Sequence, residues 1–296
     1  MRFDPQAAVT EHTFRLIGEE MLGINPNRVV REKMKEYVSF FGTVPVVCAD
    51  LWALIDPINA VHPNAEPKHL LWALYFLTKY NEELTNCKIV GIKDPKTFRE
   101  WAWLFVNALA DADARVIVWN HRFQNWDHNI NCLVSIDGTD CSIKEPWPFN
   151  TIYYSQKLNG PGLKYEVAVA IMSDNIVWVN GPFPAGTSDL TIFREGLLMM
   201  LADDEGVECD NFYKGEDQLK NPKVHQGASY KNQKKKVRAR HENLNARLKL
   251  FKVLDETFRH DHRKHGICFR AVAVVVQTNM NHDRGSLFEV EYNIRY

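Results

Sequence analysis

The chain has 296 residues, of which 45% are hydrophobic and 25% are charged, and its net charge is −1. This mixture is typical of a folded globular protein and excludes an intrinsically disordered chain. The longest unbroken apolar run is Leu70–Leu77, far short of the roughly 20 residues that a membrane-spanning helix needs. Residues 1–14 contain no apolar signal segment. We therefore expect a soluble, intracellular protein with no membrane partner.

The first 125 residues predict an all-helical region. Apolar residues recur at spacings of three and four over residues 28–41, which indicates a helix. Gly42 and Thr43 interrupt this pattern, and a second apolar helix is expected over 45–55. Two helices joined by a short turn have the outline of a DNA-binding helix-turn-helix, although an ordinary helical hairpin has the same outline. Further helices are expected over 68–80, 95–108 and 111–123.

From residue 126 the pattern predicts strands as well as helices. Residues 132–136 form an apolar run that ends at Asp137-Gly138-Thr139, which predicts a strand entering a turn. A strand buried on both faces is expected over 165–172, with a hairpin partner over 176–179. A helix beginning near Ser188, a short strand over 206–209 and a long basic helix over 231–260 complete the order.

This order of elements predicts the fold. Three hairpin-linked strands followed by a helix and a further strand form the opening of a ribonuclease-H-like α/β fold, a mixed sheet with flanking helices. In that arrangement the first and fourth strands lie side by side, so Asp137 and Asp210 would meet at their ends. We therefore predict a helical region over 1–125 that includes the candidate helix-turn-helix, and a catalytic domain over 126–296.

Two aspartates from separate strands favour metal-dependent chemistry on phosphodiesters. Such catalysis uses two divalent cations, one at the attacking oxygen and one at the leaving oxygen, and Mg²⁺ prefers carboxylate ligands. Glu242, on the basic helix, would supply a third carboxylate beside Asp137 and Asp210. An Asp at a strand end is also a common turn residue, so each acid by itself is a weak indication.

The expected orientation of Glu242 conflicts with this site. On a straight helix, Glu242 would lie nearly opposite an apolar stripe, at about 100° per residue. Either the helix bends, or its apolar face packs on the N-terminal helices instead of the sheet. The stripe comprises Leu244, Leu248, Phe251 and Phe258.

A basic segment suggests a polyanionic partner. Between Lys214 and Lys264 there are 15 Lys or Arg and 6 Asp or Glu, which leaves the rest of the chain with a charge of about −10. The segment could bind DNA phosphates or act as a nuclear localisation signal, and a solvated helical surface is the alternative. The candidate DNA contacts are Lys234, Lys235, Lys236, Arg238, Arg240, Arg247 and Lys249.

Several segments together resemble one known family. They are IDGTDCSIKEP at 136–146, YYSQKLNGPGLKYEVAVAI at 153–171, IVWVNGPFPAGTSDLTIF at 176–193, CDNFYKG at 209–215 and RARHENLNARLKLFKVL at 238–254. The combination resembles the DDE transposases of the PIF/Harbinger group, especially a divergent protist branch. By this resemblance Asp137 and Asp210 match the two aspartates of the catalytic triad and Glu242 its glutamate, and Asp189 matches an acid with a supporting role.

The resemblance also implies cofactors, partners and a location. The triad would hold two Mg²⁺ or Mn²⁺ ions, and the substrates would be the DNA ends of the element and a DNA target. A separate Myb-like DNA-binding partner, homo-oligomers and a nuclear location are expected. Two alternatives stay open: a domesticated, catalytically silent DNA-binding protein, and a ribonuclease-H-like nuclease of repair or RNA processing.

Overall fold

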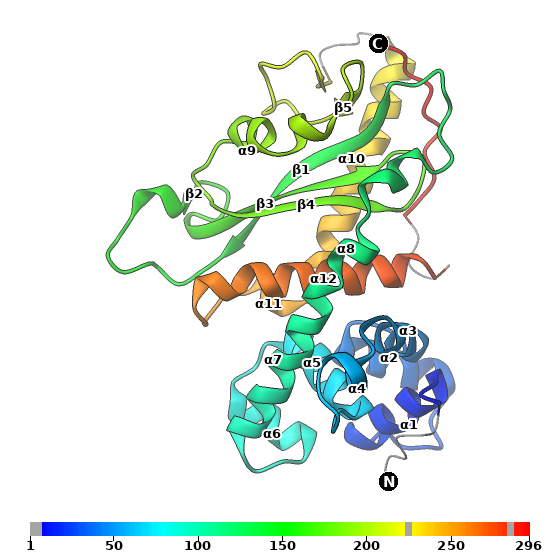
Figure 1. The fold of residues 1–296 in the computed structure, drawn as a ribbon, viewed down its shortest axis with the longest axis vertical. Helices are drawn as coiled ribbons and strands as arrows, with labels where there is room; N and C mark the ends of the chain where they lie inside the picture. The colour runs from blue at the N-terminus through cyan, green and yellow to red at the C-terminus, as the bar shows by residue number, and fades with distance from the viewer. Residues whose placement is uncertain (1–7, 223–226, 283–286) are drawn as a thin grey trace. The chain divides into compact units, whose positions relative to one another are not determined.

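The computed structural model describes residues 8–222, 227–282 and 287–296 (Figure 1). These residues form two compact units, each with most of its residue contacts inside itself. Unit 1 contains the described residues up to Val116, Lys249–Glu256 and Ile267–His282. Unit 2 contains Ile117–Leu248, Thr257–Gly266 and the described residues after 286. The boundary predicted between residues 125 and 126 stays a prediction, because a compact unit is not by itself an independently folding domain.

Unit 1 is built of helices around α5 (Pro67–Lys79). All of Leu70–Leu77 is buried, so the longest apolar run of the sequence forms the centre of a helical core. The other helices are α1 (Glu11–Met21), α2 (Val30–Phe41), α3 (Pro45–Ile55), α4 (Pro57–Ala60), α6 (Glu83–Val90), α7 (Pro95–Asp111), α8 (Asp113–Val116), α11 (Lys252–Asp255) and most of α12 (His265–Met280).

The predicted helix over 111–123 is not continuous. α7 ends at Asp111, α8 forms one further turn, and the 3-10 helix η1 (Trp119–Phe123) follows in unit 2. Trp119 packs against the hydrophobic core of unit 2, and its indole N–H donates to the Met200 carbonyl. The chain therefore leaves the helix because its two ends belong to different cores.

The pair α2 and α3 matches the two helices predicted over 28–41 and 45–55. Gly42 ends α2 in the left-handed conformation, with φ of 71°. α3 has no Lys or Arg and buries six of its eleven residues, which disfavours it as a DNA-reading helix. In the described parts of the chain, no single helix is long and apolar enough to cross a membrane. Only α2 and α3 together, bent by 42°, reach that length and composition.

Unit 2 contains a mixed six-stranded sheet in the order β2-β3-β1-β5-β6, with β4 also paired to β3. β1 is antiparallel to β3 and parallel to β5, so the first and fourth predicted strands are neighbours, as the fold prediction requires. The strands are β1 (Cys132–Ser142), β2 (Tyr154–Ser155), β3 (Gly160–Ala170), β4 (Ile176–Pro184), β5 (Gly206–Glu208) and β6 (Leu219–Lys220).

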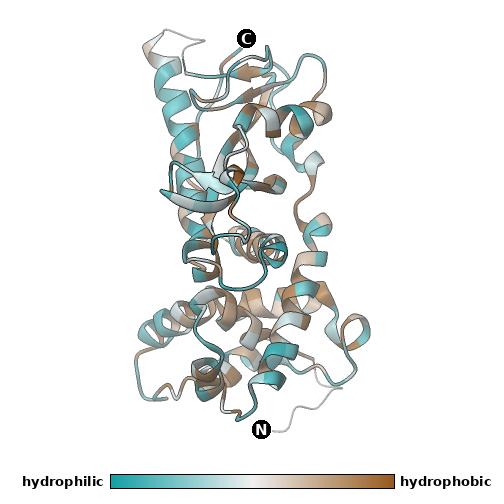
Figure 2. Ribbon diagram, turned by 90° about the vertical axis from the view of Figure 1, so that its left-hand side faces the viewer, coloured by the Kyte–Doolittle hydropathy of each residue, from teal (hydrophilic) through white to brown (hydrophobic). Residues whose placement is uncertain are grey.

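Helices cover both faces of this sheet (Figure 1). On one face, α9 (Asp189–Glu195) and the 3-10 helix η3 (Leu197–Met200) pack Phe193 and Leu197 against apolar strand residues. On the other face lies α10 (Ala228–Leu248), which is rich in hydrophilic residues (Figure 2). Val237 of α10 packs there with Tyr292 from the end of the chain. This is the ribonuclease-H-like α/β arrangement that the order of elements predicted.

Candidate active site

Asp137 lies near the middle of β1. The turn predicted at Asp137-Gly138-Thr139 is wrong, because β1 continues as far as Ser142. The strand continues because β3 pairs with it along this whole stretch, with Val167 opposite Asp137. What changes at Asp137 is the other neighbour: β5 pairs with β1 only as far as Ser135. Asp137 therefore lies where β1 loses a partner strand on one side.

Asp210 follows β5 at the same end of the sheet. In the parallel register, Glu208 of β5 lies opposite Ser135 of β1, and the two aspartates each lie two residues further along. Residues two apart in a strand point to the same face, so the register directs both carboxyl groups to one side. Asp137 and Asp210 accordingly line a single cavity of about 380 Å³.

Glu242 lines the same cavity from α10. The single helix predicted over 231–260 is wrong at its C-terminal end, because α10 ends at Leu248. Phe251 is buried in unit 1, and Phe258 forms a backbone bridge with Ile143 just after β1, so neither belongs to the stripe that was expected on the helix. The apolar side chains beyond Leu248 pack outside the face of α10, so the helix ends before them.

His241 fixes the orientation of α10 on the sheet. Its Nδ1 lies 3.1 Å from Ser135 Oγ, and its Nε2 lies 3.1 Å from the Val167 carbonyl oxygen. Because a carbonyl only accepts, Nε2 donates and Nδ1 accepts from the serine. Burial lowers the pKa of His241 to about 4, so the ring is neutral at pH 7. Glu242 is about 100° further round the helix, at the edge of the buried face and not opposite it.

Amide donors hold the two aspartates in place. Asn245 Nδ2 donates to Asp137 Oδ2 at 2.9 Å, and the Gly138 N–H donates to Oδ1 at 2.9 Å. The Phe212 N–H donates to Asp210 Oδ1 at 2.8 Å. Asn245 was not predicted from the sequence; its spacing of about one helical turn from Glu242 along α10 was the only available signal.

Both aspartates are costly to ionise. Burial raises the pKa of Asp137 above its ordinary value, although the charge of Lys157 lowers it. Burial also raises the pKa of Asp210; the hydrogen bond from the Phe212 N–H lowers it, and the negative charge of Asp137 raises it further. Two partly desolvated carboxylates that repel each other form a site that a cation would stabilise.

Asp189 lies beside these aspartates at the start of α9. Lys164 Nζ forms an ion pair with Asp189 Oδ1 at 2.9 Å. A Cβ added to Gly138 would lie 3.0 Å from the same oxygen, so the glycine lets this carboxylate approach β1 closely. Asp189 lines a second cleft of about 1010 Å³ together with Asp137 and Asp210. Its supporting role stays a prediction.

Two of the seven predicted DNA contacts lie inside the protein. Lys234 forms an ion pair with Glu208 Oε2 at 3.2 Å, and both side chains are at most 3% exposed. Arg240 is also buried; it forms an ion pair with Asp174 at 3.0 Å. Both side chains therefore stabilise the core and cannot contact a DNA phosphate, which corrects the prediction for them. Arg240 also donates to the carbonyls of Ala170, Ile171 and Ser173.

The other five predicted contacts are accessible to different degrees. Lys235, Lys236 and Arg238 are exposed, and Arg238 lines the cavity that contains the aspartates. Arg247 and Lys249 are half-buried. Successive residues of a helix are about 100° apart around its axis, so a run of basic residues includes both buried and exposed side chains. DNA contact by these five residues stays a prediction.

The donor set suits a hard divalent cation in its chemistry. Asp137, Asp210 and Glu242 offer carboxylate oxygens from three separate elements around one cavity, and Mg²⁺ and Mn²⁺ prefer such ligands. In the described ranges of the chain, no three His, Cys, Asp or Glu side chains are close enough together to hold one ion. The charge of Asp137 acts on Asp210, so these two carboxylates are the principal candidate ligands, and Glu242 lines the same cavity.

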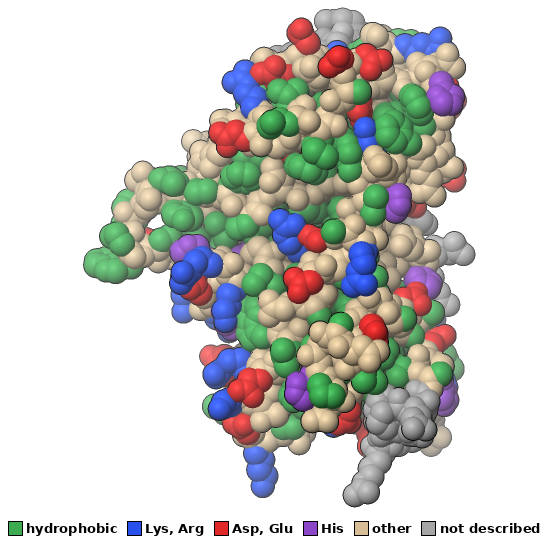
Figure 3. Space-filling model, viewed as in Figure 1, with side chains coloured by type: hydrophobic (Ala, Val, Ile, Leu, Met, Phe, Trp, Pro, Cys, Tyr) green, Lys and Arg blue, Asp and Glu red, His purple; other side chains and the backbone are tan. Residues whose placement is uncertain are grey.

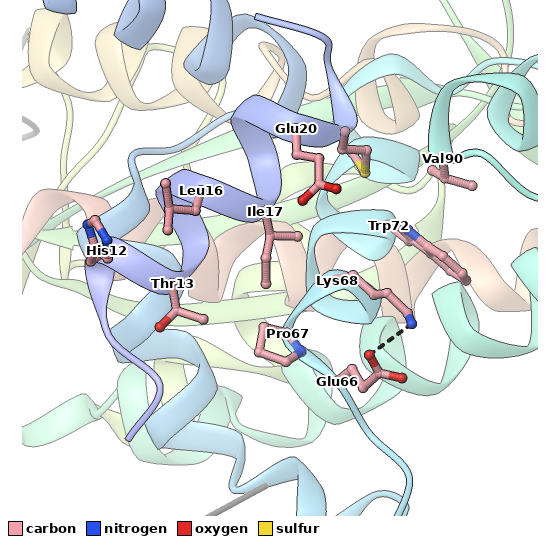
Figure 4. Close-up of a pocket in the computed structure, with 11 residues that line it drawn as sticks. His12, Thr13, Leu16, Ile17, Glu20, Glu66, Pro67, Lys68, Trp72 and Val90 are labelled. Carbon is pink, nitrogen blue, oxygen red and sulfur yellow. Dashed lines mark hydrogen bonds and ion pairs between the residues drawn. The ribbon is translucent and has the colours of Figure 1, made fainter. Parts of the chain in front are cut away.

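A separate pocket lies within unit 1 (Figure 4). Its volume is about 480 Å³, and apolar side chains of α1 such as Leu16 and Ile17 point into it. An ion pair between Lys68 and Glu66, at 2.8 Å, lies at its margin. The pocket contains none of the predicted site residues.

The residues around the carboxylate site are similar to one known protein family. Residues 136–277 match the model of the DDE superfamily endonuclease family. This segment begins one residue before Asp137 and includes Asp189, Asp210 and Glu242. The match supports the DDE superfamily and a transposase-like nuclease domain, whose relatives normally use divalent metals. No curated protein and no solved structure matches the chain significantly.

Proposed function

We propose that unit 2 is a metal-dependent endonuclease of transposase type that cuts, and also joins, DNA phosphodiesters. One observation carries the proposal: β1 and β5 bring Asp137 and Asp210 to one cavity that Glu242 also lines. The match to DDE superfamily endonucleases over the same residues supports it.

The residues around the cavity have distinct tasks in this proposal. Asp137 and Asp210 would hold divalent cations, with Glu242 as the third carboxylate. When bound there, two such ions activate the attacking oxygen and stabilise the leaving oxygen. Asn245 orients Asp137 through its hydrogen bond. Lys157 lines the same cavity and would attract the scissile phosphate.

The branch of the DDE superfamily that we propose depends on the sequence motifs. The segments at 136–146, 153–171, 209–215 and 238–254 support a transposase of the PIF/Harbinger type, derived from a mobile element. Its substrates would then be element ends and target DNA. A Myb-like partner, assembly into homo-oligomers and a nuclear location belong to the same proposal, because such a transposase acts on chromosomal DNA.

Nicking of supercoiled plasmid in Mn²⁺ tests the catalytic assignment. We expect wild type to nick, and Asp137→Asn and Asp210→Asn each to lose roughly a hundredfold or more in rate, because each removes a ligand whose loss costs several kcal/mol at the transition state. Asp203→Asn, an exposed carboxylate in a turn, is the matched control and should nick like wild type. A chelator should abolish nicking by wild type.

Other outcomes point elsewhere. Equal nicking by all four proteins would mean that the cleavage occurs at another site. Silence from all of them, on element ends as well as on plasmid, with DNA binding that ignores Mg²⁺, would favour the silent DNA-binding protein. A preference for RNA-containing duplexes would favour a nuclease of repair or RNA processing.

Cation binding is measurable without cleavage. Added Mn²⁺ should raise the thermal midpoint of wild type, because a ligand at a hundred times its Kd stabilises the folded state by about 2.7 kcal/mol. The variant with both Asp137→Asn and Asp210→Asn should show no such shift. An equal shift in both proteins would place the bound cation elsewhere.

A further inference from the structure

Exposed aromatic rings line a second cleft that also contains Asp137 and Asp210. Phe149 is 63% exposed, Tyr154 45% and Phe212 81%, although large apolar side chains are normally covered. All three line the cleft of about 1010 Å³ that contains Asp137 and Asp210. Figure 3 shows hydrophobic side chains gathered on the projecting segment between β1 and β3, at the left.

The rings come from two separate parts of the chain and are held by backbone contacts. On the segment after β1, the Gly186 N–H donates to the Ile152 carbonyl at 2.8 Å, and Tyr154 pairs with β3. Phe212 follows β5, and its backbone N–H donates to Asp210, so the backbone that carries the ring is held beside a candidate ligand. Two elements thus present aromatic faces around the same carboxylates.

The lining of the cleft defines the chemistry of its occupant. Aromatic faces bind flat rings by stacking, and Lys157, also in the lining, attracts an anion. Carboxylates that hold divalent cations bind phosphate oxygens through them. A nucleotide unites these three features, whereas an apolar protein surface would have to cover Asp137, Asp189 and Asp210, which costs desolvation.

We propose that this cleft takes an unpaired DNA nucleotide next to the scissile phosphate, with its base stacked on the rings of Phe149, Tyr154 and Phe212. The inference rests on the proposed function and adds its substrate class. The base must be unpaired, because neighbouring base pairs cover both of its faces inside a duplex. The cleft is large enough, since pockets for small organic ligands measure about 300–1,000 Å³.

Equilibrium binding in Ca²⁺, a cation that carboxylate oxygens also hold, tests this separately from nicking in Mn²⁺. Two duplexes of the same sequence are compared by fluorescence anisotropy, one fully paired and one with a short run of unpaired nucleotides. We expect wild type to bind the second about tenfold more tightly, as stacking of a base on an aromatic side chain allows. A fluorescent adenine analogue in the unpaired run should report stacking by loss of emission.

The variants separate ring stacking from apolar contact. Phe149→Leu combined with Phe212→Leu keeps apolar side chains at exposed positions but removes the rings, so the preference should fall to within about twofold. Ile152→Ala, an exposed aliphatic residue on the same segment that does not line the cleft, is the matched control and should keep the full preference. Far-ultraviolet circular dichroism checks that both remain folded.

Three results would overturn the inference: equal affinity of wild type for both duplexes, an undiminished preference in the double leucine variant, or no binding of either duplex. None of these results would contradict the proposed function if the same preparation nicks plasmid in Mn²⁺ and Asp137→Asn abolishes that nicking. Conversely, a preparation that never nicks but shows the ring-dependent preference would refute the nuclease and retain the nucleotide site.

Discussion

The two faces of the sheet in unit 2 differ in the polarity of the side chains that they carry beside β1 and β5. Under α9, the strands present apolar side chains such as Ile136 and Ala168 to a core with Phe193 and Leu197. Under α10, the same strands present polar or charged side chains at successive inward positions. These are Ser135 and Asp137 on β1, Glu208 at the end of β5, and Asp210 two residues beyond it.

The difference shows that burial alone does not mark a functional residue. Glu208 is neutralised by Lys234 and accepts hydrogen bonds from the hydroxyls of Tyr292 and Tyr296, so it is satisfied inside the core. Asp210, two residues later on the same side, is held by a backbone N–H. The first carboxylate has a structural counter-ion, whereas the second is available for a cation from solution.

The largest expected effect tests the structural pair. Lys234→Met should lower the free energy of unfolding by about 3–5 kcal/mol, because it leaves the buried Glu208 charge uncompensated. Urea unfolding followed by tryptophan fluorescence measures it. Lys235→Met, at the exposed neighbouring position, should change stability by less than about 0.5 kcal/mol. If adding Glu208→Gln to Lys234→Met restores nothing, the pairing is not the cause.

A carboxyl on the otherwise apolar face provides the next test. Burial raises the pKa of Glu166 to about 8, and its Oε2 has no hydrogen-bond partner. Between its unfolded pKa, about 4.3, and pH 8, the folded state therefore holds a proton that the unfolded state releases.

Stability should accordingly fall as pH rises through this window, because the unfolded state binds fewer protons there. Each pKa unit corresponds to about 1.4 kcal/mol, so the total is at most about 5 kcal/mol. Glu166→Gln should flatten the dependence, as unfolding titrations at several pH values would show. An unchanged slope would mean that other groups cause it.

Asn245→Ala tests the polar support of the site. Loss of the hydrogen bond to Asp137 should cost about 1 kcal/mol of stability, and the rate of nicking should fall about tenfold because the carboxylate loses its orientation. Asn243→Ala, an exposed asparagine on the same helix, is the control. A normal rate in Asn245→Ala would show that Asp137 is oriented by other contacts.

The smallest effect has the opposite sign. Asp210→Asn removes a charge that burial and Asp137 disfavour but keeps an oxygen for the Phe212 N–H, so the metal-free protein should become more stable at pH 7. The gain should vanish as pH falls, because Asp210 is then protonated in wild type too. A loss of stability at pH 7 would show that the charge is satisfied in the folded protein.

The sequence by itself determined the order of elements and the meeting of two strands. Apolar runs, turn residues and helical spacing predicted β1, β3, β4, α9 and β5, and this order gives a sheet in which β1 and β5 are parallel neighbours. The order of elements and the pairing of neighbouring strands can be predicted because they depend on the local spacing of apolar residues and on short connections, both of which are visible in the sequence. The placement of Asp137 and Asp210 on one side follows from them.

Only the tertiary structure decided where elements end and which charges are buried. β1 passes through Asp137-Gly138-Thr139 because β3 continues beside it, and α10 stops at Leu248 because Phe251 packs into another core. Likewise, Lys234 and Lys235 are adjacent and chemically identical, yet one is buried and the other exposed. The two side chains differ because they point in different directions from the axis of α10. The orientation of α10 is fixed by contacts with residues distant in the sequence, such as those of His241 with the sheet.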